Sequence, residues 1–73
     1  MEIDQLLSAW QDVLQRDEPL AVDMNLADVE EWDSLAQVGM AAFFERKLGI
    51  HVSSETLAQC KSVQDLLSLA GKA

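Results

Sequence analysis

Residues 34–50, SLAQVGMAAFFERKLGI, contain the pattern that decides the fold. At about 100° per residue, one side of a helix over residues 34–48 collects the side chains that a small core can bury. They are Gln37, Met40, Ala41, Phe44 and Leu48. Ser34 followed by Gln37 has the pattern of a capping box, and Gly49 suits the left-handed position after a last helical turn. The stretch predicts a central amphipathic helix with Ser34 as its N-cap.

The opposite side of this helix is also largely apolar. Behind Ser34 it carries Leu35, Val38, Gly39 and Ala42, followed by Glu45 and Arg46. An exposed apolar stripe commonly binds partners. A helix that is apolar all round is also typical of a central helix covered by its neighbours. The periodicity leaves both interpretations open.

The two segments that precede this helix differ in pattern. Apolar residues at helical spacing predict a first helix over residues 3–16. Residues 17–33 have no sustained period and contain the only proline and seven acids without a base, which indicates a long acidic loop. Loops of this length are uncommon in compact domains and are usually functional or disordered. We expect the following residues to anchor this loop to the core: Met24, Leu26, Val29 and Trp32.

The last third of the chain also predicts helices. A short helical turn is expected around Leu57, ending near Cys60. A final helix is expected to begin at Ser62, with Asp65 as its capping partner, and to stop at Gly71. The fold prediction is therefore all-α: one domain over residues 1–73, a small bundle of three main helices and one short helix, with a long loop between helices one and two.

Composition and charge exclude several classes of function. A chain of 73 residues buries only about 60% of its unfolded surface, so its core is thin. Thirteen acidic against five basic residues give a net charge of −8, which repels nucleic acid and anionic lipid. The longest apolar run covers residues 38–44, far short of the roughly 18 residues that indicate a membrane span. We expect no nucleic-acid or membrane partner, and a basic surface on any protein steered to this chain.

The residues available for catalysis or metal binding are few. One histidine, one cysteine and no tyrosine give little from which to build an acid–base or nucleophilic site, although spacing leaves a Cys60–His51 pair open. We expect a half-buried Cys60, a solvent-facing His51, no metal site and no enzyme. A lone cysteine and no signal-like segment favour the cytoplasm.

The run Glu31-Trp32-Asp33-Ser34-Leu35 resembles the acyl carrier protein family, which has an Asp-Ser-Leu triplet at the start of its second helix. The resemblance extends to the length, the helix order, the long first loop, the Leu48-Gly49-Ile50 helix ending and the start of the final helix at Ser62. It covers nearly the whole chain.

This resemblance implies that Ser34 receives 4′-phosphopantetheine from coenzyme A through a phosphopantetheinyl transferase. Asp33 and Leu35 would flank the modified serine and aid recognition by the transferase. The thiol of the arm would carry acyl groups between the loading and transferring enzymes of a fatty-acid, polyketide or other specialised pathway, and the carrier would act as a monomer. The docking face would be formed by Val38, Gly39, Ala42, Glu45 and Arg46.

Two alternatives remain open from the sequence. The first is an aminoacyl or peptidyl carrier, although Asp33 before Ser34 favours the acyl type. The second is an unmodified helical interaction module, in which Ser34 is only a cap and Leu35, Val38 and Ala42 bind a partner helix. Trp32 and the non-acidic Gly39 and Arg46 depart from the common fatty-acid type and favour a free-standing carrier of a specialised pathway.

Overall fold

Burial of one side of the central helix organises the molecule. In the computed structural model, which describes residues 1–72, α2 (Ser34–Phe43) continues directly into η2 (Phe44–Leu48), a single wide π-helical turn. Met40 and Phe44 are completely buried. Gly49 ends the segment at φ 67° and ψ 24°, a left-handed conformation that glycine adopts without strain. The predicted helix over residues 34–48 is confirmed in extent, with a wider last turn than expected.

Helix α1 (Ile3–Leu14) packs across α2. The ring of Trp10 stacks on that of Phe44, with 5.9 Å between centroids and 8° between planes. A Cβ atom on Gly39 would lie 3.6 Å from Cγ1 of Val13, so the small residue lets the two helices approach closely. The predicted end of this helix at residue 16 is wrong, because Gln15 turns the chain with φ 54°.

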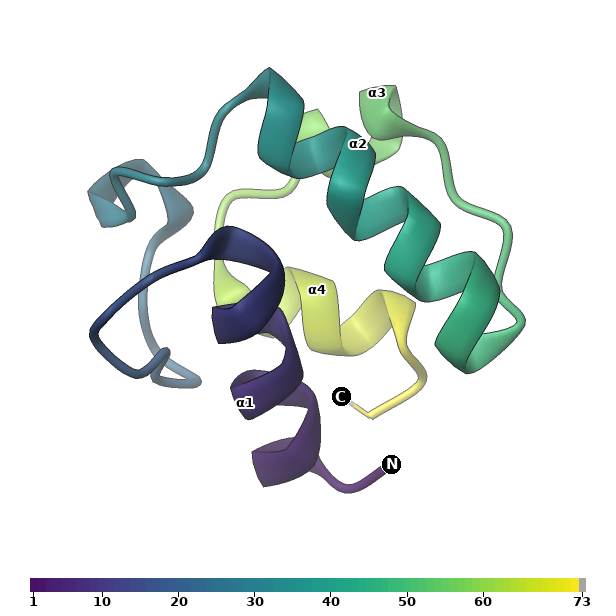
Figure 1. Cartoon of the computed structure of the whole chain (residues 1–73), viewed down its shortest axis with the longest axis horizontal. Helices are drawn as coiled ribbons and strands as arrows, with labels where there is room; N and C mark the ends of the chain where they lie inside the picture. Colours follow the sequence, from purple (N-terminus) through teal and green to yellow (C-terminus); the bar gives the residue numbers. More distant parts are fainter. Residues whose placement is uncertain (73) are drawn as a thin grey trace.

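Two shorter helices complete the bundle. Helix α3 (Ser54–Ala58) lies against α2, and α4 (Val63–Leu69) lies between α1 and α2 (Figure 1). Ser62 caps α4, since its hydroxyl accepts the N–H of Asp65 at 3.2 Å and the Asp65 carboxylate accepts the N–H of Ser62 at the same distance. This capping pair is as predicted. The buried residues of these helices are Leu57, Val63, Leu66 and Leu67.

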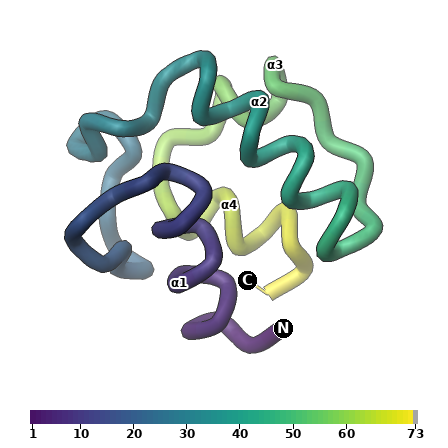
Figure 2. The backbone as a smooth tube through the Cα atoms, viewed as in Figure 1, coloured from purple at the N-terminus to yellow at the C-terminus, as the bar shows by residue number. Residues whose placement is uncertain are grey.

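The long loop is anchored to the rest of the fold (Figure 2). It contains one short 3₁₀ helix, η1 (Leu26–Asp28). Leu26 and Val29 are buried, and Met24 and Trp32 pack against the core, which confirms the predicted anchors. The N–H of Leu26 donates to the carbonyl of Lys61 at 2.9 Å, and an isolated antiparallel bridge joins Asn25 to Ser62.

The all-α fold class is confirmed, because residues 1–72 form helices and no named strand. No described helix is long and apolar enough to cross a membrane. Both ends of the described chain lie on one side of the bundle (Figure 1), where Nζ of Lys72 is 3.9 Å from Oε1 of Glu2.

Replacing Phe44 tests this account of the core. Phe44→Ala should lower the free energy of unfolding by about 3–5 kcal/mol, because it removes a fully buried ring that stacks on Trp10. Leu35→Ala is the control, since a side chain that is 79% exposed should change stability by less than about 0.5 kcal/mol. Urea unfolding measures both, and equal losses in the two variants would contradict the account.

Candidate functional site

The loop places Ser34 at the exposed start of α2. Val29 is buried in the core, and the N–H of Trp32 donates to the carbonyl of Val29 at 3.0 Å, so a tight turn fixes the chain just before the helix. Asp33 follows in an extended conformation, with φ −131°. Ser34 is the first residue of α2, and its side chain faces solvent.

Asp33, rather than Ser34, caps this helix. The Asp33 carboxylate accepts the N–H of Ala36 at 2.8 Å, and its backbone carbonyl accepts the N–H of Gln37 at 3.0 Å. The prediction of Ser34 as the N-cap with Gln37 as its partner is therefore wrong. The N–H of Gln37, which a cap at Ser34 was expected to bind, is taken by the backbone carbonyl of Asp33. As a result, the Ser34 hydroxyl makes no hydrogen bond within residues 1–72.

The helix start also leaves two backbone donors free. The N–H groups of Ser34 and Leu35 have no partner among the described residues, whereas those of Ala36 and Gln37 are taken by Asp33. Free N–H groups and the positive end of the helix dipole attract phosphate oxygens. A phosphodiester on the Ser34 hydroxyl would lie beside both donors, so these residues suit such a group.

Among residues 1–72, the other serines do not combine an exposed, unpaired hydroxyl with free N–H groups at a helix start. The hydroxyls of Ser53 and Ser62 are occupied as caps, accepting the N–H of Thr56 at 3.1 Å and of Asp65 at 3.2 Å. Ser54 begins the five-residue helix α3 and is only half-exposed. Ser8 and Ser68 are exposed but lie inside α1 and α4, where backbone N–H groups bond within the helix.

The second apolar stripe of α2 is divided between surface and interior. Leu35 and Val38 are 79% and 58% exposed. Gly39 and Ala42 are half-buried, and Gly39 faces Val13 of α1. Leu35 and Val38 therefore fit the interpretation as an exposed, partner-binding stripe, whereas Gly39 and Ala42 fit that of a central helix covered by its neighbours. The charged residues that follow on this side, Glu45 and Arg46, are exposed.

Two acids of the loop, Glu18 and Glu31, lie close to Arg16, a base just before the loop. Nη1 of Arg16 donates to Oε1 of Glu31 at 2.8 Å, and Nη2 of Arg16 is 3.8 Å from Glu18. The hydrogen bond from Arg16 lowers the pKa of Glu31, so this carboxylate stays charged to lower pH than an ordinary glutamate. The pair therefore stabilises the loop at neutral pH, and that contribution is lost as the pH falls through the lowered pKa. Exposed acids near the helix start, Asp28, Glu30 and Asp33, keep this surface negative.

The two candidates for nucleophilic chemistry lie as expected. Cys60 is half-buried, and burial, together with the nearby charge of Asp65, raises the pKa of its thiol, which favours the unreactive protonated form. His51 is 86% exposed, with Nδ1 3.7 Å from Oε1 of Glu45. Among residues 1–72, no group of three or more potential ligands is arranged to hold a metal ion.

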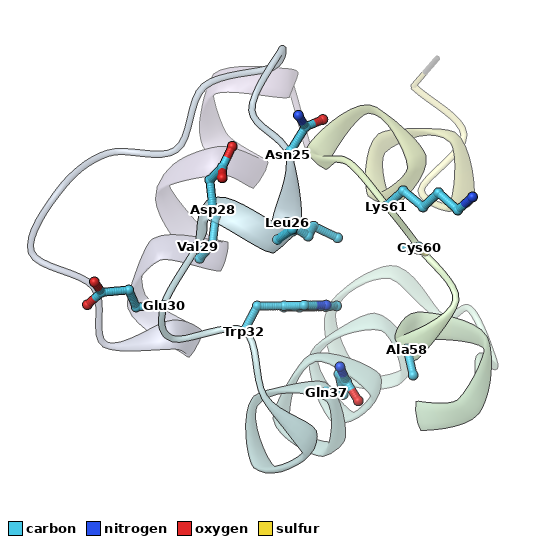
Figure 3. Close-up of a pocket in the computed structure, with 11 residues that line it drawn as sticks. Asn25, Leu26, Asp28, Val29, Glu30, Trp32, Gln37, Ala58, Cys60 and Lys61 are labelled. Atoms are coloured by element: carbon cyan, nitrogen blue, oxygen red, sulfur yellow. The ribbon is translucent and has the colours of Figure 1, made fainter.

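A groove opens beside the start of α2, which the sequence pattern did not predict (Figure 3). Its lining comes from the loop, from α2, from the end of α3 and from the segment that joins α3 to α4. The groove therefore forms only when distant segments are brought together. Trp32, which the sequence predicts as an anchor of the loop, is one of the residues that line this groove. The residues that line the Trp32 groove are Asn25, Leu26, Ala27, Asp28, Val29, Glu30, Trp32, Gln37, Ala58, Cys60 and Lys61.

One comparison with known proteins found a match to a family. A family model described as PP-binding, phosphopantetheine attachment site, matches residues 4–70. The chain therefore belongs to the family of phosphopantetheine carrier domains. Members of this family carry 4′-phosphopantetheine covalently on a serine and are generally non-catalytic, interacting with transferases and pathway enzymes. Searches of curated proteins and of solved structures found no significant match.

Because Asp33 caps the helix and Ser34 does not, substitutions at these two neighbouring residues should change stability by different amounts. Asp33→Ala should lower the free energy of unfolding by about 1 kcal/mol, because the N–H of Ala36 loses its acceptor. Asp33→Asn should retain most of the stability, since an amide oxygen also caps. Ser34→Ala should change stability by less than about 0.5 kcal/mol. Thermal or urea unfolding measures all three, and a larger loss for Ser34→Ala than for Asp33→Ala would mean that the serine is the cap.

Proposed function

We propose that Ser34 is the attachment site of 4′-phosphopantetheine and that the protein is an acyl carrier protein. The observation that carries this proposal is an exposed serine at the head of a ten-residue helix. Within residues 1–72 its hydroxyl has no hydrogen-bond partner, and the first two N–H groups of the helix have none either. Membership of the family implies the phosphopantetheine cofactor. Asp33-Ser34-Leu35 matches the Asp-Ser-Leu triplet of the acyl carrier proteins, which this chain resembles.

The residues around Ser34 have separate tasks in this proposal. Asp33 holds the helix start in place and leaves the Ser34 hydroxyl free for modification. The N–H groups of Ser34 and Leu35 orient the phosphate, and the exposed Leu35 side chain contacts the transferase. The thiol at the end of the bound arm forms thioesters with acyl groups, and the flexible tether presents them to several enzymes at high effective concentration.

The docking face is proposed to surround Ser34 along α2. Leu35 and Val38 are its exposed apolar part. Glu45 and Arg46 add charged side chains further along the helix. Gly39 and Ala42 are half-buried and have small side chains, so a partner can approach the helix closely there. We propose that the carrier acts as a monomer in the cytoplasm and holds acyl intermediates of a fatty-acid, polyketide or other specialised pathway. The acids of the loop would attract partner enzymes that have a basic surface.

Modification by a transferase of broad specificity tests the attachment site. Incubation with coenzyme A should add one phosphopantetheine to the wild type and none to Ser34→Ala, as measured by intact-protein mass spectrometry. Ser54→Ala and Ser68→Ala are matched controls and should be modified as fully as the wild type. An unmodified wild type, or a modified Ser34→Ala, would contradict the proposal.

Loading by dedicated enzymes separates the acyl from the aminoacyl carrier. The phosphopantetheinylated protein should be acylated by ATP-dependent acyl-activating enzymes from its own source and not by amino-acid-activating enzymes from that source. Thioester formation is followed by mass spectrometry, with hydroxylamine release as the control for the thioester bond. Exclusive loading with amino acids would overturn the acyl assignment and retain the carrier.

A further inference from the structure

A second pocket opens beside Ser34, between α1 and the start of α2. Its volume is about 620 Å³. Its lining comes from residues 13–15 at the end of α1, from Glu31 and Asp33 of the loop, and from residues 35–39 of α2 except Gln37. Both sequence neighbours of Ser34, Asp33 and Leu35, line this α1–α2 pocket, and neither lines the Trp32 groove. A group attached to Ser34 therefore starts directly beside the α1–α2 pocket.

Gly39 lines this pocket, and neither backbone conformation nor a clash requires glycine rather than alanine there. It lies inside α2 and has no positive φ, unlike Gly49 and Gly71. A Cβ atom at position 39 would lie 3.6 Å from Cγ1 of Val13, which is an ordinary contact, so alanine would fit. Glycine makes the interior of a helix less stable than alanine does. What glycine provides instead is open space in the α1–α2 pocket, which any side chain would reduce.

The apolar part of the lining is only partly covered by the fold. Leu14 is buried and Val13 is half-buried, whereas Leu35 and Val38 remain exposed. Exposed apolar surface of this kind gains free energy when a ligand removes it from water. The pocket therefore favours a ligand with an apolar part.

The polar part of the lining includes two carboxylates that are held in place. The Glu31 carboxylate accepts a hydrogen bond from Nη1 of Arg16 at 2.8 Å, and the Asp33 carboxylate accepts the N–H of Ala36 at 2.8 Å. Because an ionised carboxylate has about four acceptor sites, both groups can accept further hydrogen bonds from a ligand. Their negative charge disfavours an anionic ligand. A ligand that fits this lining is therefore not anionic and has N–H or O–H donors.

The pantetheine part of the arm has this chemistry. Beyond its phosphate it is uncharged, and it carries two methyl groups on one carbon, a hydroxyl and two amide groups. The methyl groups match Leu35 and Val38. The hydroxyl and the amide N–H groups match the acceptors of Glu31 and Asp33. Attachment at Ser34 also holds the chain at a high effective concentration beside the pocket, so a weak fit is enough to fill it.

We propose that the α1–α2 pocket is the binding site of the pantetheine arm when no enzyme holds it. This inference rests on the proposed function of Ser34 and deepens it, because it names the residues of this chain that bind the cofactor. Leu35, Val38 and Gly39 belong both to this pocket and to the proposed docking face. A partner that covers them takes the place of the arm. Docking therefore releases the arm toward the active site of the partner.

Nuclear magnetic resonance of the holo protein tests the site. Coenzyme A and a transferase attach the arm, and mass spectrometry verifies one group at Ser34. In the isotope-labelled wild type, nuclear Overhauser contacts should join the two methyl groups of the arm to the methyl groups of Val13 and Val38. Val13 lies on α1, so the covalent bond at Ser34 does not by itself bring the arm to it. Ala27 and Ala58 line the Trp32 groove and should show no such contacts.

Substitutions at position 39 provide matched variants. Gly39→Leu should weaken the contacts of the arm with Val13 at least about fivefold, because the added side chain takes up space in the pocket. Gly39→Ala fits against Val13 without a clash, so it keeps the fold and should weaken the same contacts to a smaller extent. Ala58→Leu, in the Trp32 groove, is the control and should leave them unchanged.

The possible outcomes separate this inference from the proposed function. Contacts of the arm with Ala27 or Ala58 instead of Val13 would overturn the inference, and so would a holo wild type without contacts in either pocket. Contacts with Val13 that persist unchanged in both Gly39 variants would overturn it as well. A wild type that carries no group on Ser34 is detected first, by mass, and would instead overturn the proposed function together with this inference.

Discussion

The stacked rings of Trp10 and Phe44 hold α2 against α1, and the geometry of the site depends on that contact. Both rings are completely buried, and the wide turn η2 begins at Phe44. With its middle and end fixed, α2 has a fixed direction, and its first turn projects at the surface. The anchored loop then has only to deliver the chain to that point. Aromatic side chains bury about 150–250 Å² each, so this contact contributes strongly to the packing of a small domain.

At the head of the helix, two neighbouring residues divide two tasks that a single serine could not perform together. A hydroxyl that accepts a backbone N–H as a cap is committed to that bond, as in Ser53 and Ser62. Asp33 takes the structural task with its carboxylate, and the hydroxyl of Ser34 has no partner among the described residues. The triplet Asp-Ser-Leu therefore has a physical rationale in this chain: the cap, the proposed attachment residue and an exposed apolar side chain follow one another.

Most of the fold follows from local pattern, and most of the site does not. Helical periodicity around Met40 and Phe44, the capping pair of Ser62 and Asp65 and the glycine at position 49 predicted the helices, because each signal is contained within a few residues. The identity of the N-cap was missed, since Asp33 and Ser34 are both good caps and only the backbone conformation decides between them. The Trp32 groove was also missed, because its walls come from segments about 35 residues apart in the sequence that pair through the bonds of Leu26 and Val63.

The carrier account rests on one covalent bond, and its most direct test is to look for that bond in the protein from its native cells. Peptide mapping by tandem mass spectrometry should find phosphopantetheine on the peptide that contains Ser34, with fragment ions that place it on that residue. Native protein that carries the group on another serine, or that carries none even when isolated with its transferase present, would contradict the account.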